Sequence, residues 1–257
     1  MPIFPGAEPM RHDGSRTGVL LCHGFTSSPQ SLRPWGNYLV DRDYSVSLPL
    51  LPGHGTRWQD LQVTGWPDWY ATVERELALL RERCDQVFVA GLSMGGALAL
   101  RLAARHGDAV SGVLVVNPAM TLPRLSELAL PVLRHVVPSS RGLTNDIAWE
   151  DAPYELGYDR VPLHAAYSLG KLFRMVRDDL PRVTQPLLLL HSRTDHVAPP
   201  SDSALVLSRV SAKDVTETVL EHSYHVVTLD HDAERVFADG EGFIRRIAAR
   251  KTARDGA

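Results

Sequence analysis

The sequence alternates short strand-like runs with amphipathic segments, and this alternation constrains the fold more than any other feature. The runs with the length and composition of strands are residues 17–24, 44–50, 87–91, 112–118, 186–195 and 215–221. Between them, apolar residues at helical spacing predict helices at about residues 31–42, 66–83, 95–105, 202–210 and 233–249. Apolar strands separated by helices indicate a parallel sheet that is covered on both faces. We therefore predict an α/β protein.

The alternation is interrupted between residues 119 and 181, where prolines are frequent, helical signals are short and no strand is clear. It resumes with the run at 186–195. We therefore predict one domain with a core of residues 1–118 and 182–257, and with residues 119–181 as an insertion. Ligands of open α/β sheets bind at the carboxyl ends of the strands, so we expect the insertion to form a cap over that edge.

Composition argues against several classes of function. The formal net charge of −3 gives no electrostatic case for binding nucleic acid or an anionic membrane. No apolar run reaches transmembrane length, so we expect a soluble, cytoplasmic protein without an integral membrane segment. Cys22 and Cys84 are far apart and are typical of small buried hydrophobic residues. His54 has no partner at ligand spacing, and we predict no metal site.

The run VFVAGLSMGGALAL, residues 87–100, places one hydroxyl between small residues. In a G-x-S-x-G pattern the serine lies on a sharp turn between a strand and a helix, with its Oγ above the sheet edge. Gly91 and Gly95 leave room that a Cβ would fill, and the start of the following helix favours developing negative charge. A helix start without chemistry is the alternative. The flanking strand and helix favour Ser93 as a nucleophile.

A serine nucleophile needs a base, and the chain order typical of this arrangement is serine, acid, histidine. Asp195 lies at the carboxyl end of a predicted strand, where the acid is expected. After the next strand, the stretch EHSYHVVTLD offers His222 and His225 as the base. We select His225 because it lies deeper in the loop, before an apolar run; His222 then faces solvent or orients the loop. His196 is interpreted as a loop neighbour of the acid.

Two hydrogen-bond donors must stabilise the oxyanion of such a reaction. The backbone N–H of Met94, directly after the nucleophile, is one expected donor. The second is the backbone N–H of Phe25, in the loop LLCHGFTSSP after the first predicted strand. We interpret His23 and the PGHG turn at residues 52–55 as structural.

The stretches LLCHGFTSSPQSLRPW, LPGHG, GLSMGG, SRTDHVAPP and SYHVVTLD resemble, in this order, the bacterial carboxylesterase and monoacylglycerol lipase family. The resemblance covers most of the chain and weakens in the cap. It implies an α/β-hydrolase fold, a mostly parallel sheet flanked by helices with a cap insertion. It also implies a catalytic triad of Ser93, Asp195 and His225, with Phe25 and Met94 as the oxyanion hole.

The cap stretch ELGYDRVP, residues 155–162, is similar to a cap stretch of the monoacylglycerol lipases whose glutamate meets the glycerol head group. The resemblance implies this substrate-binding role for Glu155. Glu150 and Asp151 are nearby competitors. A solvent-facing cap carboxylate is the alternative interpretation.

These expectations describe a serine carboxylic-ester hydrolase that forms an acyl-enzyme, acts on monoacylglycerols or short-to-medium acyl esters, and requires no cofactor. The alternatives are a thioesterase, a C–C hydrolase or a peptidase of the same fold and, more remotely, a non-catalytic ligand-binding receptor. The sequence does not indicate an oligomeric state. The apolar cap residues predicted to cover an acyl tunnel, or otherwise to pack on the core, are Leu122, Leu125, Leu128, Leu130, Val132, Leu133, Val136 and Val137.

Overall fold

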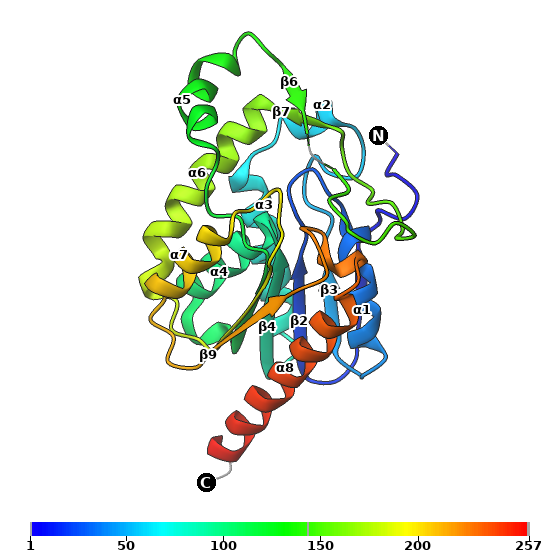
Figure 1. Cartoon of the computed structure of the whole chain (residues 1–257). Helices are drawn as coiled ribbons and strands as arrows, with labels where there is room; N and C mark the ends of the chain where they lie inside the picture. Colours follow the sequence, from blue (N-terminus) through cyan, green and yellow to red (C-terminus); the bar gives the residue numbers. More distant parts are fainter. Residues whose placement is uncertain (1, 143, 256–257) are drawn as a thin grey trace.

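A seven-stranded sheet forms the centre of the computed structural model, which describes residues 2–142 and 144–255, with side chains up to residue 250 (Figure 1). The strand order is β1-β3-β2-β4-β5-β8-β9. The strands are β1 (Met10–His12), β2 (Thr17–Cys22), β3 (Ser45–Leu48), β4 (Gln86–Leu92), β5 (Gly112–Val116), β8 (Leu187–Ser192) and β9 (Val215–Leu220). β1 pairs with β3 in the antiparallel direction, and the other neighbouring pairs are parallel. The predicted mostly parallel sheet is confirmed.

Helices cover both faces of this sheet (Figure 1). α1 and α8 pack on one face, and α3, α4 and α7 pack on the other. The helices of the core are α1 (Arg33–Val40), α2 (Trp58–Gln62), α3 (Trp66–Arg81), α4 (Met94–His106), α7 (Pro200–Arg209) and α8 (Ala233–Asp255). Short 3₁₀ turns are η1 (Pro29–Leu32), η2 (Gly107–Ala109), η3 (Leu180–Arg182) and η4 (Val227–Leu229). No helix in the described parts of the chain is both long and apolar enough to cross a bilayer.

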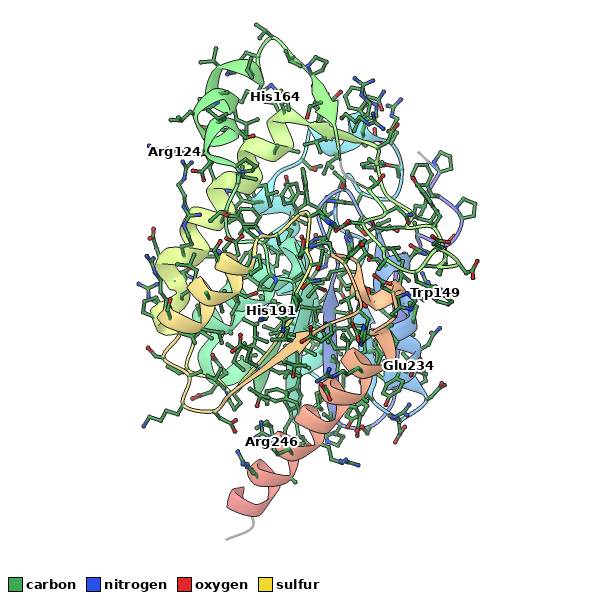
Figure 2. All side chains as sticks on the ribbon, viewed as in Figure 1. Arg124, Trp149, His164, His191, Glu234 and Arg246 are labelled. Carbon is green, nitrogen blue, oxygen red and sulfur yellow. The ribbon has the colours of Figure 1, made fainter. Side chains whose placement is uncertain are left out.

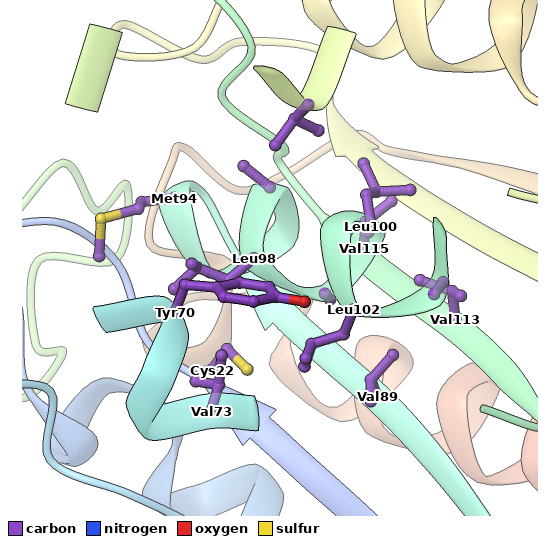
Figure 3. Close-up of a cluster of buried hydrophobic side chains, with 14 of the residues drawn as sticks. Cys22, Tyr70, Val73, Val89, Met94, Leu98, Leu100, Leu102, Val113 and Val115 are labelled. Carbon is purple, nitrogen blue, oxygen red and sulfur yellow. The ribbon is translucent and has the colours of Figure 1, made fainter. Parts of the chain in front are cut away.

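The central strands are mostly apolar because each of them faces two hydrophobic cores. In β5, Val113 and Val115 belong to the core under α3 and α4, part of which Figure 3 shows. The alternate residues, Leu114 and Val116, belong to the core under α1 and α8. Successive side chains of a strand point to opposite faces, so a strand buried on both faces needs an apolar residue at each position. β2, β4 and β8 follow the same rule.

The insertion at residues 119–181 lies between β5 and β8. Its elements are α5 (Arg124–Leu133), β6 (Ser139–Arg141), β7 (Arg160–Pro162) and α6 (Leu163–Asp179). The expectation of no strand here is wrong, since β6 and β7 form an antiparallel pair. Both strands have three residues, which is too short for an alternating pattern to be visible in the sequence. Figure 1 shows α5, β6 and β7 beyond one edge of the central sheet, with α6 descending beside α4.

Buried carboxylates of the core tie the insertion down. Asp202 of α7 accepts hydrogen bonds from the backbone N–H groups of Met120, at 2.7 Å, and Thr121, at 3.0 Å. Asp230 accepts bonds from the backbone N–H groups of Ala148, at 2.8 Å, and Trp149, at 2.9 Å. Arg124 is the first residue of α5, and Figure 2 shows Trp149 on the other side of the molecule from it. Residues 119–181 are therefore anchored to the rest of the chain at two separate points.

Candidate active site

Ser93 lies at the sharp turn between β4 and α4, in a strained backbone conformation. Its φ of 57° and ψ of −121° fall in a region that residues with a Cβ rarely adopt. Its N–H donates to the carbonyl of Val116 at 3.0 Å. Its carbonyl accepts hydrogen bonds from the N–H groups of Gly96, at 3.0 Å, and Ala119, at 3.3 Å. These bonds hold the turn in place at the carboxyl edge of the sheet.

The glycines on each side of Ser93 are required by close backbone contacts. A Cβ on Gly91 would lie 2.2 Å from the carbonyl carbon of Gly95. A Cβ on Gly95 would lie 1.8 Å from the carbonyl oxygen of Cys22, at the end of β2. Both distances are far below contact distance, and both involve backbone atoms that cannot rotate away. The predicted need for small residues at both positions is confirmed.

We therefore expect Gly95→Ala to lower the free energy of unfolding by about 3 kcal/mol or more, as overpacking against fixed backbone does. Chemical denaturation followed by circular dichroism measures the loss. The matched control is Gly242→Ala in α8, where a new Cβ meets nothing within 4 Å. That change should be neutral or stabilising by up to about 1 kcal/mol. Equal stabilities for the two variants would contradict the tight packing of the turn.

His225 and Asp195 form a buried pair in the loops that follow the neighbouring strands β9 and β8. His225 Nδ1 lies 2.8 Å from Asp195 Oδ2, and the two side chains are 8% and 3% exposed. The other carboxylate oxygen of Asp195 accepts hydrogen bonds from the N–H groups of Val197 and Ala198, each at 2.8 Å. A histidine that donates its Nδ1–H to a carboxylate presents Nε2 as the proton acceptor. This is the tautomer that a serine nucleophile needs.

The structure separates His225 from the other candidate histidines. His222 is exposed, and its backbone N–H donates to Asp232 Oδ2 at 2.8 Å. His196 is also exposed, and its Nδ1 lies 2.8 Å from Asp146 Oδ1, so it pairs with a different carboxylate from His225. Of these three rings, that of His225 is the one that hydrogen-bonds the Asp195 carboxylate.

A cavity of about 410 Å³ brings the predicted residues together. Ser93, His225, Phe25, Met94 and Glu155 all line it, although they come from separate segments of the chain. Its wall is mainly apolar and is contributed largely by the insertion. The apolar residues of this wall include Leu122, Leu130, Leu163, Ala166, Leu169 and Phe173.

Only some of the residues predicted to cover an acyl tunnel line the cavity. Leu122 and Leu130 line the cavity. The other six predicted residues are exposed on the outer face of α5 and the turn after it: Leu125, Leu128, Val132, Leu133, Val136 and Val137. The sequence did not single out Leu163, Leu169 and Phe173 of α6, which supply much of the wall. Their helical spacing is the signal that could have identified them.

The backbone N–H groups of Phe25 and Met94 are available to a ligand. Among the described residues, neither group makes a hydrogen bond. Met94 is the first residue of α4, so its N–H has no partner within the helix. Its side chain is buried in the core that Figure 3 shows, and this packing fixes the main chain beside Ser93.

His23 holds the loop that carries Phe25. Its Nδ1 donates to the carbonyl of Gly24 at 2.9 Å, and its Nε2 accepts from the N–H of Leu51 at 3.1 Å. Burial lowers the pKa of His23 to about 4, so the ring is neutral at pH 7. Burial and the adjacent His23 also lower the pKa of His54 well below its usual value. The structural interpretation of His23 is confirmed, because its ring bonds the backbone on both sides.

Glu155 is a buried carboxylate in the cavity wall. Its Oε1 accepts a hydrogen bond from Ser27 Oγ at 2.6 Å, and its Oε2 accepts one from the N–H of Asn145 at 3.3 Å. Glu150 and Asp151 are exposed and do not line the cavity. The alternative of a solvent-facing carboxylate at Glu155 is therefore wrong. The contacts of Glu155 with Ser27 and Asn145 were not predicted: Ser27 lies in the loop that carries Phe25, but nothing in that motif points to the cap, and Asn145 belongs to none of the motifs.

A family model described as serine aminopeptidase, S33, matches residues 13–232. The chain is also 36% identical over 247 residues to a thermostable monoacylglycerol lipase of Bacillus sp. (strain H-257), covering 96% of this chain and 98% of that one. The chain belongs to the family of α/β hydrolases that this model describes and shares it with the monoacylglycerol lipase. The resemblance in the sequence is thereby confirmed.

Other relatives agree with this assignment. A carboxylesterase of Bacillus subtilis (strain 168) is 25% identical, with 93% of this chain and 97% of the relative covered. A solved structure from work on two metagenome-derived lipolytic enzymes has a TM-score of 0.92 and 36% identity, covering 95% of this chain and 100% of that one. A monoacylglycerol lipase of Paleococcus ferrophilus, 22% identical with a TM-score of 0.76, covers 93% of this chain and 99% of its own and shares the fold. These relatives are ester-bond hydrolases by name.

Proposed function

We propose that the protein is a serine carboxylic-ester hydrolase that acts on monoacylglycerols, or on short-to-medium acyl esters, through an acyl-enzyme. The observation that carries this proposal is the buried Asp195–His225 pair, whose histidine lines the same cavity as a serine on a strained turn. Membership of the hydrolase family and the names of the whole-length relatives support it.

In the first half of the reaction, Ser93 Oγ attacks the ester carbonyl and His225 Nε2 takes the hydroxyl proton. Asp195 stabilises the imidazolium that forms and keeps the ring in the required orientation. The protonated histidine then gives its proton to the leaving alcohol. In the second half, His225 removes a proton from water, which attacks the acyl carbon; the bond from that carbon to Ser93 Oγ then breaks, the carboxylic acid leaves, and His225 returns the proton to Oγ.

The tetrahedral intermediates carry a negative oxygen, which the N–H groups of Phe25 and Met94 would bind. Donors that are fixed before the reaction need no reorganisation when charge develops. The N-terminus of α4 adds a favourable electrostatic field at the same point. Residues 119–181 are proposed to act as the cap that excludes water from this site. This proposal is supported by the apolar cavity wall that α5 and α6 provide.

Glu155 is proposed to bind the hydroxyls of a glycerol head group. A carboxylate can accept about four hydrogen bonds, and protein donors occupy two of these positions in Glu155. A site that pairs a buried carboxylate with substrate hydroxyls disfavours esters without them, because the remaining acceptor positions of the carboxylate then stay unpaired.

We expect Glu155→Gln to weaken kcat/KM for a monoacylglycerol by the equivalent of about 1–3 kcal/mol, as a hydrogen bond to a charged group is lost. A p-nitrophenyl ester with the same acyl chain has no free hydroxyl, so its hydrolysis should change little. Both substrates are measured on one preparation, with the exposed Asp151→Asn as the matched control. Parallel losses on both substrates would show that Glu155 is structural.

The remaining alternatives differ in the bond that is cleaved. The description of the family model favours peptidase activity as the second candidate, and aminoacyl p-nitroanilides test it directly. Acyl thioesters and activated carbon–carbon substrates test the thioesterase and C–C hydrolase alternatives in the same panel. A receptor on this scaffold would bind esters without turnover.

The oligomeric state was not predicted, and the cytoplasmic location stays a prediction.

A further inference from the structure

Asp146, in the insertion, contacts both loops that carry the acid and the base. Its Oδ2 accepts hydrogen bonds from the backbone N–H groups of His225, at 3.2 Å, and His196, at 3.3 Å. Its Oδ1 lies 2.8 Å from His196 Nδ1. Its main-chain carbonyl accepts a further bond from the N–H of Val226 at 3.0 Å. One residue of the insertion thus binds the base itself and the residue that follows the acid.

The two loops need such a connection because the sheet ends before them. β8 and β9 pair as far as Ser192 and Leu220, and Arg193 donates a last main-chain bond to Leu220 at 2.8 Å. Beyond this point, no further main-chain bond joins the two loops within the described residues. The spacing of Asp195 and His225 therefore depends on side chains that bridge them.

The peptide groups at His225 are held from two sides. On the side of the core, Asn117 Nδ2 donates to the carbonyl of His225 at 2.8 Å. On the side of the insertion, Asp146 accepts the N–H of the same residue. Asp146 cannot shift easily, because Asp230 binds the N–H groups of Ala148 and Trp149 just after it. Asp230 Oδ2 also accepts the N–H of Tyr224 at 2.9 Å, so it ties the same two segments together.

We propose that Asp146 is a positioning residue, which sets the distance between the acid and the base by bridging their loops from the insertion. The proposal rests on the proposed roles of Asp195 and His225. It makes the insertion part of the catalytic machinery as well as a wall of the cavity. Misplacing a catalytic group by about 1 Å can cost about 100-fold in rate, so a bridge of this kind has a measurable effect.

The first experiment measures p-nitrophenyl ester hydrolysis by Asp146→Ala. We expect kcat to fall about 10- to 100-fold, because the base is no longer aligned with the nucleophile. KM should change less than about threefold, because substrate binding is largely retained. Asp146→Asn keeps an oxygen that can accept an N–H, and should recover most of the loss. The matched control is Asp151→Ala in the same insertion, with an exposed side chain, which should leave kcat unchanged. A folded Asp146→Ala with the kcat of the control would overturn the proposal.

His196→Ala separates the two kinds of contact that Asp146 makes. It removes the ring that pairs with Asp146 Oδ1 but keeps both backbone N–H bonds. We expect it to lower kcat much less than Asp146→Ala does. An equal loss would show that Asp146 acts through the ring of His196 and would overturn a role in loop spacing. Should Asp146→Ala not fold, Asp146→Ser replaces it with the same expected loss, because the shorter hydroxyl does not reach both N–H groups.

A spectroscopic readout tests the proposal without turnover. The Nδ1 proton of His225, bonded to Asp195, should give a protected low-field proton resonance, which is lost in His225→Ala. We expect Asp146→Ala to weaken this resonance and speed its exchange with water, and Asp146→Asn to retain it. An unchanged resonance in Asp146→Ala would contradict the proposal. A wild type that hydrolyses no ester would overturn the proposed function, whereas the resonance would still report on Asp146.

Discussion

Ser93→Ala is expected to lower kcat for ester hydrolysis by about 10⁴- to 10⁶-fold, as loss of a triad residue does in serine hydrolases. The substitution removes only the hydroxyl that is proposed to attack the ester carbonyl. The turn itself is held by the backbone bonds of Ser93 to Val116, Gly96 and Ala119, none of which involves the side chain. The variant should therefore fold with the stability of the wild type, and the residual rate should reflect the oxyanion donors and substrate binding.

Two further measurements make this prediction decisive. The thermal unfolding midpoint of Ser93→Ala shows that a lost rate is not lost folding. Ser208→Ala, on the exposed side of α7, removes another serine hydroxyl that does not line the cavity and should keep full activity. More than about a tenth of wild-type activity in pure Ser93→Ala would overturn its assignment as the nucleophile.

The second large effect distinguishes two histidines three positions apart. His225→Ala is expected to reduce kcat about as much as Ser93→Ala, because nucleophile and base act as one unit. The double variant should be no slower than either single variant. His222→Ala should keep most activity, because its side chain is exposed and does not line the cavity. These three rates, measured at one pH on the same p-nitrophenyl ester, form the test.

The reverse order of the two histidine variants would mean that the base is His222. That outcome would also conflict with the 2.8 Å contact between His225 and Asp195. Additive losses in the double variant would mean that Ser93 and His225 act in separate steps. Either result would require a different mechanism.

Much of the fold was predictable because the signals are local. A strand that is buried on both faces is apolar at each position, so β2, β4, β5 and β8 were recognisable one at a time. The nucleophile turn was predictable for the same reason, since its strand, its two glycines and its helix are contiguous. The chain order then directed attention to the ends of β8 and β9, where Asp195 and His225 lie.

The remaining features depend on contacts between distant segments. Asp146 has no motif around it, and its importance comes from loops about 50 and 80 residues away in sequence. The bonds of Glu155 to Ser27 and Asn145 are of the same kind. The outer face of α5 was assigned to the tunnel because composition does not reveal which side of an amphipathic helix faces inward when its neighbours are unknown. The short pair β6 and β7 gave no periodic signal.

The most direct test of an acyl-enzyme at Ser93 is covalent labelling with a fluorophosphonate, followed by mass spectrometry of the digested protein. We expect a single adduct, on the peptide that carries Ser93, with loss of esterase activity in step with labelling. Ser93→Ala should not be labelled, and His225→Ala should be labelled far more slowly, because the hydroxyl then lacks its base. An adduct on a different residue, or continued ester hydrolysis by fully labelled protein, would contradict an acyl-enzyme at Ser93.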